Sequence, residues 1–200
     1  MPGIAPSREG RAVKGLLLGA ALAALGLNAQ ARDYAYAIAP GLPAVVTVAE
    51  PPESRLSARV GGGAEQSLGQ LGDEEVDQFQ AVDVDRDGYQ DFVVGQSGGA
   101  QLIARIFLYR PQDGSFRELA HPGGAASPCR GFVNPVFHDA RPAFSVACRY
   151  SATDYGFEDY TVCADGTLRA TAWSRRSGDS QTRLRLPAQQ SGRCSPAPKR

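Results

Sequence analysis

The sequence predicts a single-domain all-β protein, an antiparallel β-meander or propeller-like arrangement of short strands. Three observations support this prediction. Segments rich in β-branched and aromatic residues recur along the chain, turn residues separate them, and no long segment has helical periodicity. The chain of 200 residues contains 23 Gly and 14 Pro, which is typical of a protein with many turns. A sandwich or a barrel remains open as an alternative arrangement of such strands.

The first 31 residues have the three parts of a secretory signal peptide. The basic residues come first, at Arg8, Arg11 and Lys14. The continuous apolar run Gly15–Leu27 follows, and it is shorter than the roughly 20 residues that a membrane-spanning helix needs. Ala29 and Ala31 then match the small residues of a cleavage site. We expect residues 1–31 to be removed and the protein to be exported to the periplasm, with secretion as the alternative.

Acidic and basic residues balance in this chain, at 21 each. The balance excludes the strongly basic composition by which nucleic-acid-binding domains are recognised. No change in composition indicates a second domain. We expect residues 32–194 to form the all-β domain, as a monomer with no membrane span, and residues 195–200 to be a flexible tail.

Turn signals divide the exported part into short strands. Pro111–Gly114 and Ala164–Gly166 carry the Pro, Asp and Gly residues of tight turns. Polar and apolar residues alternate only weakly in Ile106–Tyr109, so we expect some strands to be buried on both faces. The predicted strands are Ala44–Ala49, Arg55–Val60, Gln78–Val82, Asp91–Gly95, Leu102–Arg110, Ser115–Leu119, Val133–Phe137, Pro142–Tyr150, Glu158–Cys163, Thr167–Trp173 and Thr182–Leu186.

The exported part contains four cysteines: Cys129, Cys148, Cys163 and Cys194. An even number of cysteines in an exported chain predicts two disulfides, for which three pairings exist. A hairpin of residues 132–137 with 142–148 would bring Cys129 and Cys148 to its open end, so we favour that pair, with Cys163 bonded to Cys194. A zinc site is the alternative, but no two cysteines have the C-x-x-C spacing typical of one.

The sharpest motif is the acidic segment 83–91, with the pattern D-x-D-x-D-G-x-x-D. Its carboxylates repel one another unless a cation lies between them, Gly88 permits a sharp turn, and this many oxygen ligands select Ca²⁺. Val94 stands where an EF-hand has its bidentate glutamate, so the loop is only EF-hand-like, within a β-hairpin. A solvated acidic turn is the alternative. The predicted calcium ligands are Asp83, Asp85, Asp87, the backbone carbonyl of Tyr89, and Asp91.

The segment Phe79–Val94 resembles the calcium loop of integrin-α-type (FG-GAP/VCBS-like) β-propeller repeats. Further similarity lies in Ile106–Tyr109, Gly114–Phe116, Phe132–Pro135, His138–Asp139, Ser145, Glu158–Tyr160 and Asp165–Leu168. Together these segments, within about residues 76–170, resemble a family of bacterial envelope proteins related to the immunity protein of a type IV secreted, lysozyme-like effector. The resemblance implies a propeller-like fold with one calcium loop and inhibition of lysozyme-type peptidoglycan hydrolases.

An inhibitor of such a hydrolase has to enter an acidic catalytic cleft. The segment Tyr150–Phe157 offers hydrogen-bonding groups and aromatic anchors, and we expect it to be a flexible interface loop. Alternatively, it is a plain hairpin loop whose aromatic rings fold back onto the sheet. Gln96–Gly99 and Arg175–Arg176 are two further candidate surfaces. The predicted partner-binding residues are Tyr150, Ser151, Tyr155, Gly156 and Phe157.

The sequence does not predict an enzyme. Its two histidines, His121 and His138, lie beside turns, and no G-x-S-x-G segment supplies a nucleophile. We therefore expect a calcium-stabilised binding protein with an immunity function, an inhibitor of a lysozyme-like peptidoglycan hydrolase. The first alternative is a non-enzymatic FG-GAP/VCBS-type envelope module that binds another protein or a glycan. The second is a secreted hydrolase that depends on His138.

Overall fold

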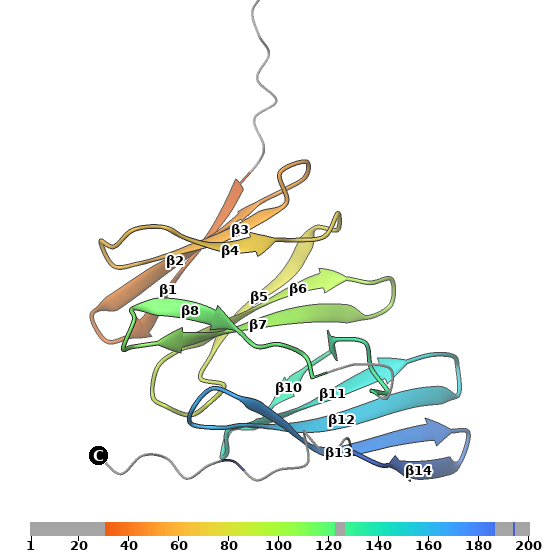
Figure 1. Ribbon diagram of the computed structural model, residues 1–200. Helices are drawn as coiled ribbons and strands as arrows, with labels where there is room; N and C mark the ends of the chain where they lie inside the picture. Colours follow the sequence, from red (N-terminus) through yellow and green to blue (C-terminus); the bar gives the residue numbers. More distant parts are fainter. Residues whose placement is uncertain (1–30, 123–126, 187–193, 195–200) are drawn as a thin grey trace, which may run out of the picture.

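The computed structural model describes residues 31–122, 127–186 and 194 (Figure 1). These residues form 14 strands and no helix, which confirms the all-β prediction. The strands lie in three open antiparallel sheets, so the described residues form no closed barrel. The predicted tail lies outside the described residues, and so does the predicted signal peptide apart from its last residue, Ala31, which begins the first strand.

The first sheet, sheet A, consists of β1 (Ala31–Ala39), β2 (Leu42–Ala49), β3 (Arg55–Val60) and β4 (Gln66–Gln70) in chain order. The sequence does not predict β1 or β4, which are the two edge strands. An edge strand pairs on one side only and needs no continuous apolar pattern, which accounts for β4. This reason does not apply to β1, which contains the apolar run of residues 34–39. The sequence of β4, QSLGQ, contains a single large apolar residue.

Sheet B consists of β5 (Val76–Val82), β6 (Asp91–Ser97), β7 (Leu102–Arg110) and β8 (Ser115–Glu118). A further strand, β9 (Phe132–Val133), pairs with β7. The predicted hairpin of residues 132–137 with 142–148 is therefore wrong in its first half. The ring of Phe132 lies 5.4 Å from that of Phe144 in sheet C, so pairing with β7 places this aromatic residue between the two sheets.

Sheet C consists of β10 (Val136–Phe137), β11 (Ala143–Arg149), β12 (Asp154–Val162), β13 (Leu168–Ser177) and β14 (Ser180–Leu184). The expectation of a flexible loop over Tyr150–Phe157 is wrong, because β12 begins at Asp154 and only residues 150–153 form the turn. The N–H of Tyr150 donates to the carbonyl of Asp154 at 2.9 Å and closes the turn tightly. Tyr155, Gly156 and Phe157 are therefore strand residues.

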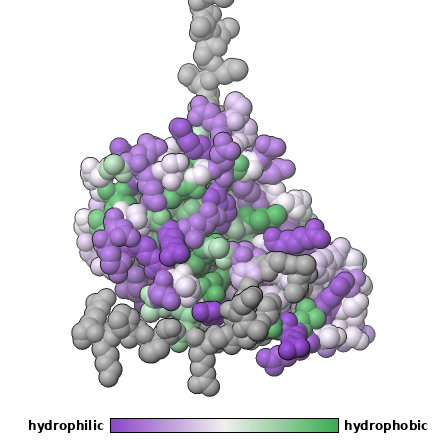
Figure 2. Space-filling view, viewed as in Figure 1, coloured by the Kyte–Doolittle hydropathy of each residue, from purple (hydrophilic) through white to green (hydrophobic). Residues whose placement is uncertain are grey.

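Sheet B is the middle layer of the stack (Figure 1). One apolar core lies between sheets A and B and a second between sheets B and C. Phe92 stacks on Phe107 at 4.7 Å in the first core, whereas its neighbour Val93 belongs to the second. The expectation of strands buried on both faces is thus confirmed for β6 and β7. Polar side chains cover much of the surface seen in Figure 2, with apolar patches between them.

Two disulfides join distant parts of the chain. Cys129 is bonded to Cys148 and Cys163 to Cys194, which confirms the predicted pairing. The first disulfide fixes the connection between sheets B and C to β11, and the second fixes residue 194 to the end of β12. Within the described part of the chain no cysteine is free. Two disulfides indicate an oxidising environment, extracellular or periplasmic.

Candidate functional site

The acidic loop, residues 83–90, connects β5 to β6, and these strands pair up to Val82 and Asp91. The predicted setting of the loop between two strands is therefore confirmed. The structure brings Asp83, Asp85 and Asp91 together, with one carboxylate oxygen of each lying within 4.8 Å of the other two. Three acidic groups so close together are the kind of oxygen cluster that holds a divalent cation.

The backbone of the loop curls around the carboxylate of Asp83. This carboxylate accepts the N–H groups of Asp87 at 3.2 Å and Gly88 at 3.1 Å. Arg86 and Gly88 both have positive φ, 60° and 94°, which turn the chain back on itself. The carboxylate of Asp87 accepts the N–H of Tyr89 at 2.9 Å, and Asp87 lies outside the cluster of three. Its predicted role as a ligand, like that of the Tyr89 carbonyl, stays a prediction.

Two of the clustered carboxylates are deeply buried. Asp91 is 0% exposed and accepts the N–H groups of Val84 at 2.8 Å and Tyr109 at 2.7 Å. The side chain of Asp85 is 3% exposed, and its Oδ1 has no hydrogen-bond partner. Burial is the main cause that raises the pKa of Asp85, to about 6, with Asp87 adding to it, and burial likewise raises the pKa of Asp91, to about 8. Ionised carboxylates in this position require a compensating positive charge.

A divalent cation fits this donor set. It would supply the missing partner of Asp85 Oδ1 and neutralise the mutual repulsion of the three carboxylates. The structure offers one positive side chain of its own, because Nη1 of Arg110 lies 3.4 Å from Oδ2 of Asp85. A single guanidinium leaves the cluster with excess negative charge, so Arg110 alone does not account for the arrangement.

The acidic loop also contacts the sheets on either side of sheet B. The N–H of Gln90 donates to the carbonyl of Ile38 in β1 at 2.7 Å. On the other side, the guanidinium of Arg86 donates to the carbonyl of His138 and lies 3.7 Å from the carboxylate of Asp139. The loop therefore joins all three sheets, and a cation bound in it would brace the whole stack.

The second candidate region is the tip of the β11–β12 hairpin, which holds the predicted partner-binding residues. Ser151 donates from Oγ to a carboxylate oxygen of Asp154 at 2.9 Å and so stabilises the turn. Tyr155 and Phe157 are half-buried and alternate along β12 with Gly156, which is buried on the opposite face. A Cβ on Gly156 would lie 2.8 Å from Cys148 Sγ, so the disulfide explains this glycine.

Arginine side chains cover these aromatic rings. The guanidinium carbon of Arg176 lies 4.7 Å from the ring centroid of Tyr155, and that of Arg175 lies 5.1 Å from that of Tyr150. Arg149 approaches the Tyr155 ring from β11, at 5.9 Å. Among residues 31–122 and 127–186, none of these three arginines forms an ion pair. We call this region the arginine–aromatic surface; it consists of Arg149, Tyr155, Phe157 and Arg176. Tyr150 and Arg175 lie on the opposite face of the sheet, because Arg175 pairs with Gly156 and a Cβ on Gly156 would lie 3.1 Å from the Tyr150 hydroxyl.

Sequence reasoning found the aromatic part of this surface and gave Arg175–Arg176 only as a separate candidate. The register of β12 with β13 places Arg176 opposite Tyr155 and Arg175 opposite Gly156. The only local signal was the pair of adjacent arginines, because the contact depends on strand pairing across about 20 positions of sequence.

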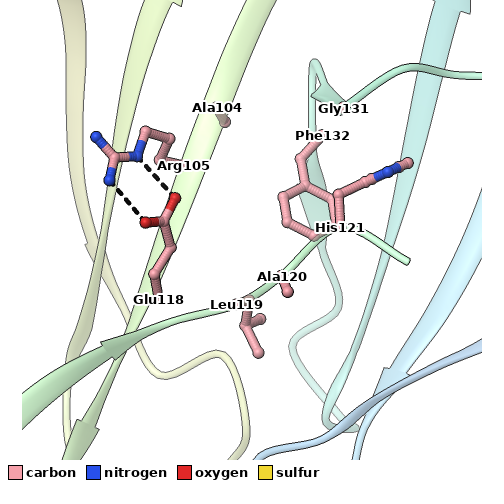
Figure 3. Close-up of a pocket in the computed structure, with 8 residues that line it drawn as sticks. All are labelled: Ala104, Arg105, Glu118, Leu119, Ala120, His121, Gly131 and Phe132. Carbon is pink, nitrogen blue, oxygen red and sulfur yellow. Dashed lines mark hydrogen bonds and ion pairs between the residues drawn. The ribbon is translucent and has the colours of Figure 1, made fainter. Parts of the chain in front are cut away.

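A cavity of about 300 Å³ lies beside β7 and the chain that follows β8. Figure 3 shows Arg105 and Glu118, joined by two hydrogen bonds, on one side of it and Phe132 and His121 on the other. Nε2 of His121 lies 3.1 Å from the carboxylate of Glu158. Glu158 is 0% exposed; burial raises its pKa, but hydrogen bonds from His121, Ser127, Tyr160 and the Cys129 N–H outweigh burial and lower it overall. These bonds hold the segment before the first disulfide against sheet C.

The second histidine takes part in a short polar chain. His138 Nε2 lies 3.3 Å from Ser145 Oγ, and that hydroxyl donates to Asp159 Oδ1 at 2.6 Å. In a Ser–His–Asp triad the aspartate orients the histidine, which takes the serine proton. Here the aspartate binds the serine, so the order is that of a surface hydrogen-bond chain.

No protein-family model, curated protein or solved structure matches this protein. Within the residues that the structure describes, no helix is long and apolar enough to cross a membrane. The functional argument therefore rests on the acidic loop and on the arginine–aromatic surface.

Proposed function

We propose that the exported protein is a non-catalytic binding protein of the periplasm that inhibits a lysozyme-like peptidoglycan hydrolase. The observation that carries the proposal is the arginine–aromatic surface, in which two exposed arginines, Arg149 and Arg176, lie over the rings of Tyr155 and Phe157 and have no ion-pair partner among the described residues. The cleft of such a hydrolase contains two catalytic carboxylates. Arginine and tyrosine are enriched among the residues that dominate binding energy, and charge complementarity favours an acidic partner.

The signal sequence and the two disulfides support periplasmic localisation. In the acidic loop, Ca²⁺ is held by Asp83, Asp85 and Asp91, with Asp87 and the Tyr89 carbonyl completing the ligand set. Outside the cytoplasm even weak calcium sites, with Kd of about 10⁻⁴–10⁻³ M, are filled. The ion is structural: it stabilises a loop that hydrogen-bonds to sheets A and C. Three successive antiparallel meanders support a propeller-like arrangement.

The decisive experiment is a cell-wall lysis assay. Processed protein in millimolar calcium is titrated against c-type and bacterial lysozyme-like hydrolases. We expect inhibition that saturates near one inhibitor per enzyme. The double substitution Arg149→Glu with Arg176→Glu should abolish it, because it places negative charge against an acidic cleft. Arg59→Glu, on an exposed position of sheet A, is the matched control and should inhibit normally.

The main alternative is a non-enzymatic FG-GAP/VCBS-type envelope module for another protein or a glycan. The stacked rings of Tyr155 and Phe157, with centroids 6.4 Å apart, favour it as a second candidate because such a platform suits a sugar ring. Full lysis across the enzyme panel, with folded and calcium-loaded protein, would overturn the inhibitor proposal. Binding of soluble peptidoglycan fragments that is lost with Tyr155→Ala would then establish the glycan-binding function.

A further inference from the structure

A second cavity lies between sheets B and C, beside the β11–β12 hairpin. It is on the face of this hairpin opposite to the arginine–aromatic surface. It has a volume of about 350 Å³ and is bounded by the β6–β7 turn, the segment 128–131 and the end of β11. This size is sufficient for one or two side chains of a partner. We call it the Ile103 pocket, after one of the residues that line it.

The floor of the Ile103 pocket is apolar and only partly covered. Ile103 is 49% exposed although it lies in a strand and pairs with Val133 of β9. Gly98 and Gly131 flank it, and a Cβ on either would lie 3.0 Å and 3.5 Å from the Ile103 side chain. The two glycines therefore keep open the space beside Ile103. Of the large apolar residues that the structure describes, Ile103, Val136 and Tyr150 are exposed, and two of them line this pocket.

The walls of the pocket are positively charged. Arg130 and Arg149 line it, and none of its lining residues is acidic. Neither arginine forms an ion pair within the described ranges. Arg130 and Arg175 also lie close enough to Tyr150 to favour its ionised form, although burial raises the pKa of Tyr150 overall. Nε of Arg149 already donates to the carbonyl of Ser151 at 2.8 Å, so Arg130 is the side chain that a carboxylate entering the pocket meets first.

The pocket is also held open by rigid contacts. The side-chain amide of Gln101 donates to the carbonyl of Arg149 at 3.2 Å and accepts the N–H of the same residue, which fastens the β6–β7 turn to sheet C. The disulfide between Cys129 and Cys148 lies in the wall. A preformed site binds without the cost of ordering its own groups.

From these observations we infer that the Ile103 pocket binds an acidic segment of a protein partner, with an aliphatic side chain against Ile103 and an adjacent carboxylate beside Arg130. The inference rests on the proposed function, since it supplies an anchor for the same acidic partner. The arginine–aromatic surface and this pocket lie on the two faces of the β11–β12 hairpin. A partner that binds around the tip of this hairpin therefore contacts both.

The test is an NMR titration of isotope-labelled processed protein with three capped tetrapeptides. The first has the sequence glycine–leucine–aspartate–glycine, the second replaces aspartate by asparagine, and the third replaces leucine by alanine. With the first peptide we expect shifts of the backbone amides of Gly98 and Gly131. The second and third should each bind about fivefold more weakly, which is the ratio expected for loss of one exposed ion pair or a similar apolar contact. Arg130→Gln should remove the preference for aspartate, and Arg59→Gln should leave it unchanged.

No shift at these two glycines with the first peptide, or equal binding of the aspartate and asparagine peptides, would overturn the inference. The outcomes separate it from the proposed function. Hydrolase inhibition without peptide binding would leave the inhibitor proposal standing and remove the pocket. Peptide binding without hydrolase inhibition would leave the pocket as a binding site for acidic segments and remove the inhibitor proposal.

Discussion

Nη1 of Arg110 lies 3.4 Å from Oδ2 of Asp85, so a positive side chain from outside the acidic loop reaches the place where a cation would bind. Arg110 comes from the end of β7, whereas Asp85 lies in the β5–β6 connection. The guanidinium is only a partial partner, because Nη2 of Arg110 and Oδ1 of Asp85 both lack hydrogen bonds. Arg110 therefore neutralises part of the negative charge of the loop, and we expect it to weaken the proposed binding of calcium.

Replacing this arginine should strengthen calcium binding. We expect Arg110→Met to lower the calcium Kd about threefold to tenfold, because it removes a positive charge next to a ligand while keeping the aliphatic part of the side chain. Isothermal titration calorimetry measures the change, and Arg59→Met is the control. An unchanged or higher Kd in the Arg110 variant would show that the cation does not bind beside Asp85.

The calcium site should contribute measurably to stability. At a calcium concentration about 100 times Kd, binding stabilises the folded state by about 2.7 kcal/mol, which corresponds to a rise of several degrees in Tm. Asp85→Asn should abolish this rise by removing a ligand charge. Asp113→Asn, which changes an exposed carboxylate in the β7–β8 turn, should retain it. Thermal unfolding measures the Tm of the wild type and of both variants with calcium and with a chelator. A wild-type Tm equal in both conditions would rule out the site.

The pH dependence of stability should change when calcium is removed. In chelator, the folded-state pKa values of Asp85 and Asp91, about 6 and about 8, exceed the ordinary aspartate value of 3.8. The folded state then binds more protons than the unfolded state between pH 4 and 8, so stability should fall as the pH rises through this window. With calcium bound, the cation keeps these carboxylates ionised and the fall should disappear. Urea unfolding at several pH values tests this, and Asp85→Asn should flatten the lower part of the window in chelator.

The disulfide should leave no room for a side chain at Gly156, near the start of β12. Gly156→Ala would place a Cβ 2.8 Å from Cys148 Sγ and 3.0 Å from the side chain of Pro128, so it should destabilise the protein by about 1–3 kcal/mol. Gly62→Ala, where a Cβ meets nothing within 4 Å, is the matched control. Chemical denaturation measures both. The cost at position 156 should shrink when Cys129 and Cys148 are both changed to alanine, and a cost that stays the same would assign it to another contact.

Sequence patterns predict those parts of the fold that are determined by residues close together in the chain. The β5–loop–β6 unit follows from apolar runs on either side of an acidic turn, and the cysteine pairing follows from an expected hairpin, part of which is present as β10–β11. The edge strand β4 has no such run, because only one of its residues is large and apolar. The other edge strand, β1, contains the apolar run of residues 34–39 and yet is not among the predicted strands.

The candidate sites show the same division. Three of the four predicted carboxylate ligands come together because they belong to one short loop. The pairing of β9 with β7, and of Arg176 with Tyr155, depends on contacts between segments far apart in the chain. No local spacing encodes those contacts, so the arginine–aromatic surface and the Ile103 pocket appear only in three dimensions.

The order of the sheets also bears on how the chain acquires its structure as it emerges N-terminus first. Apart from the pair of β7 with β9, all strand pairs join neighbours in sequence, so sheets A and B need nothing from the C-terminal third in order to pair their own strands. Such short-range topology favours rapid formation. Both disulfides lie within residues 129–194, with separations of 19 and 31 residues. Both disulfides can thus form after sheet A and strands β5–β8 have assembled. Because no cysteine precedes Cys129, an incorrect disulfide cannot form within these N-terminal strands.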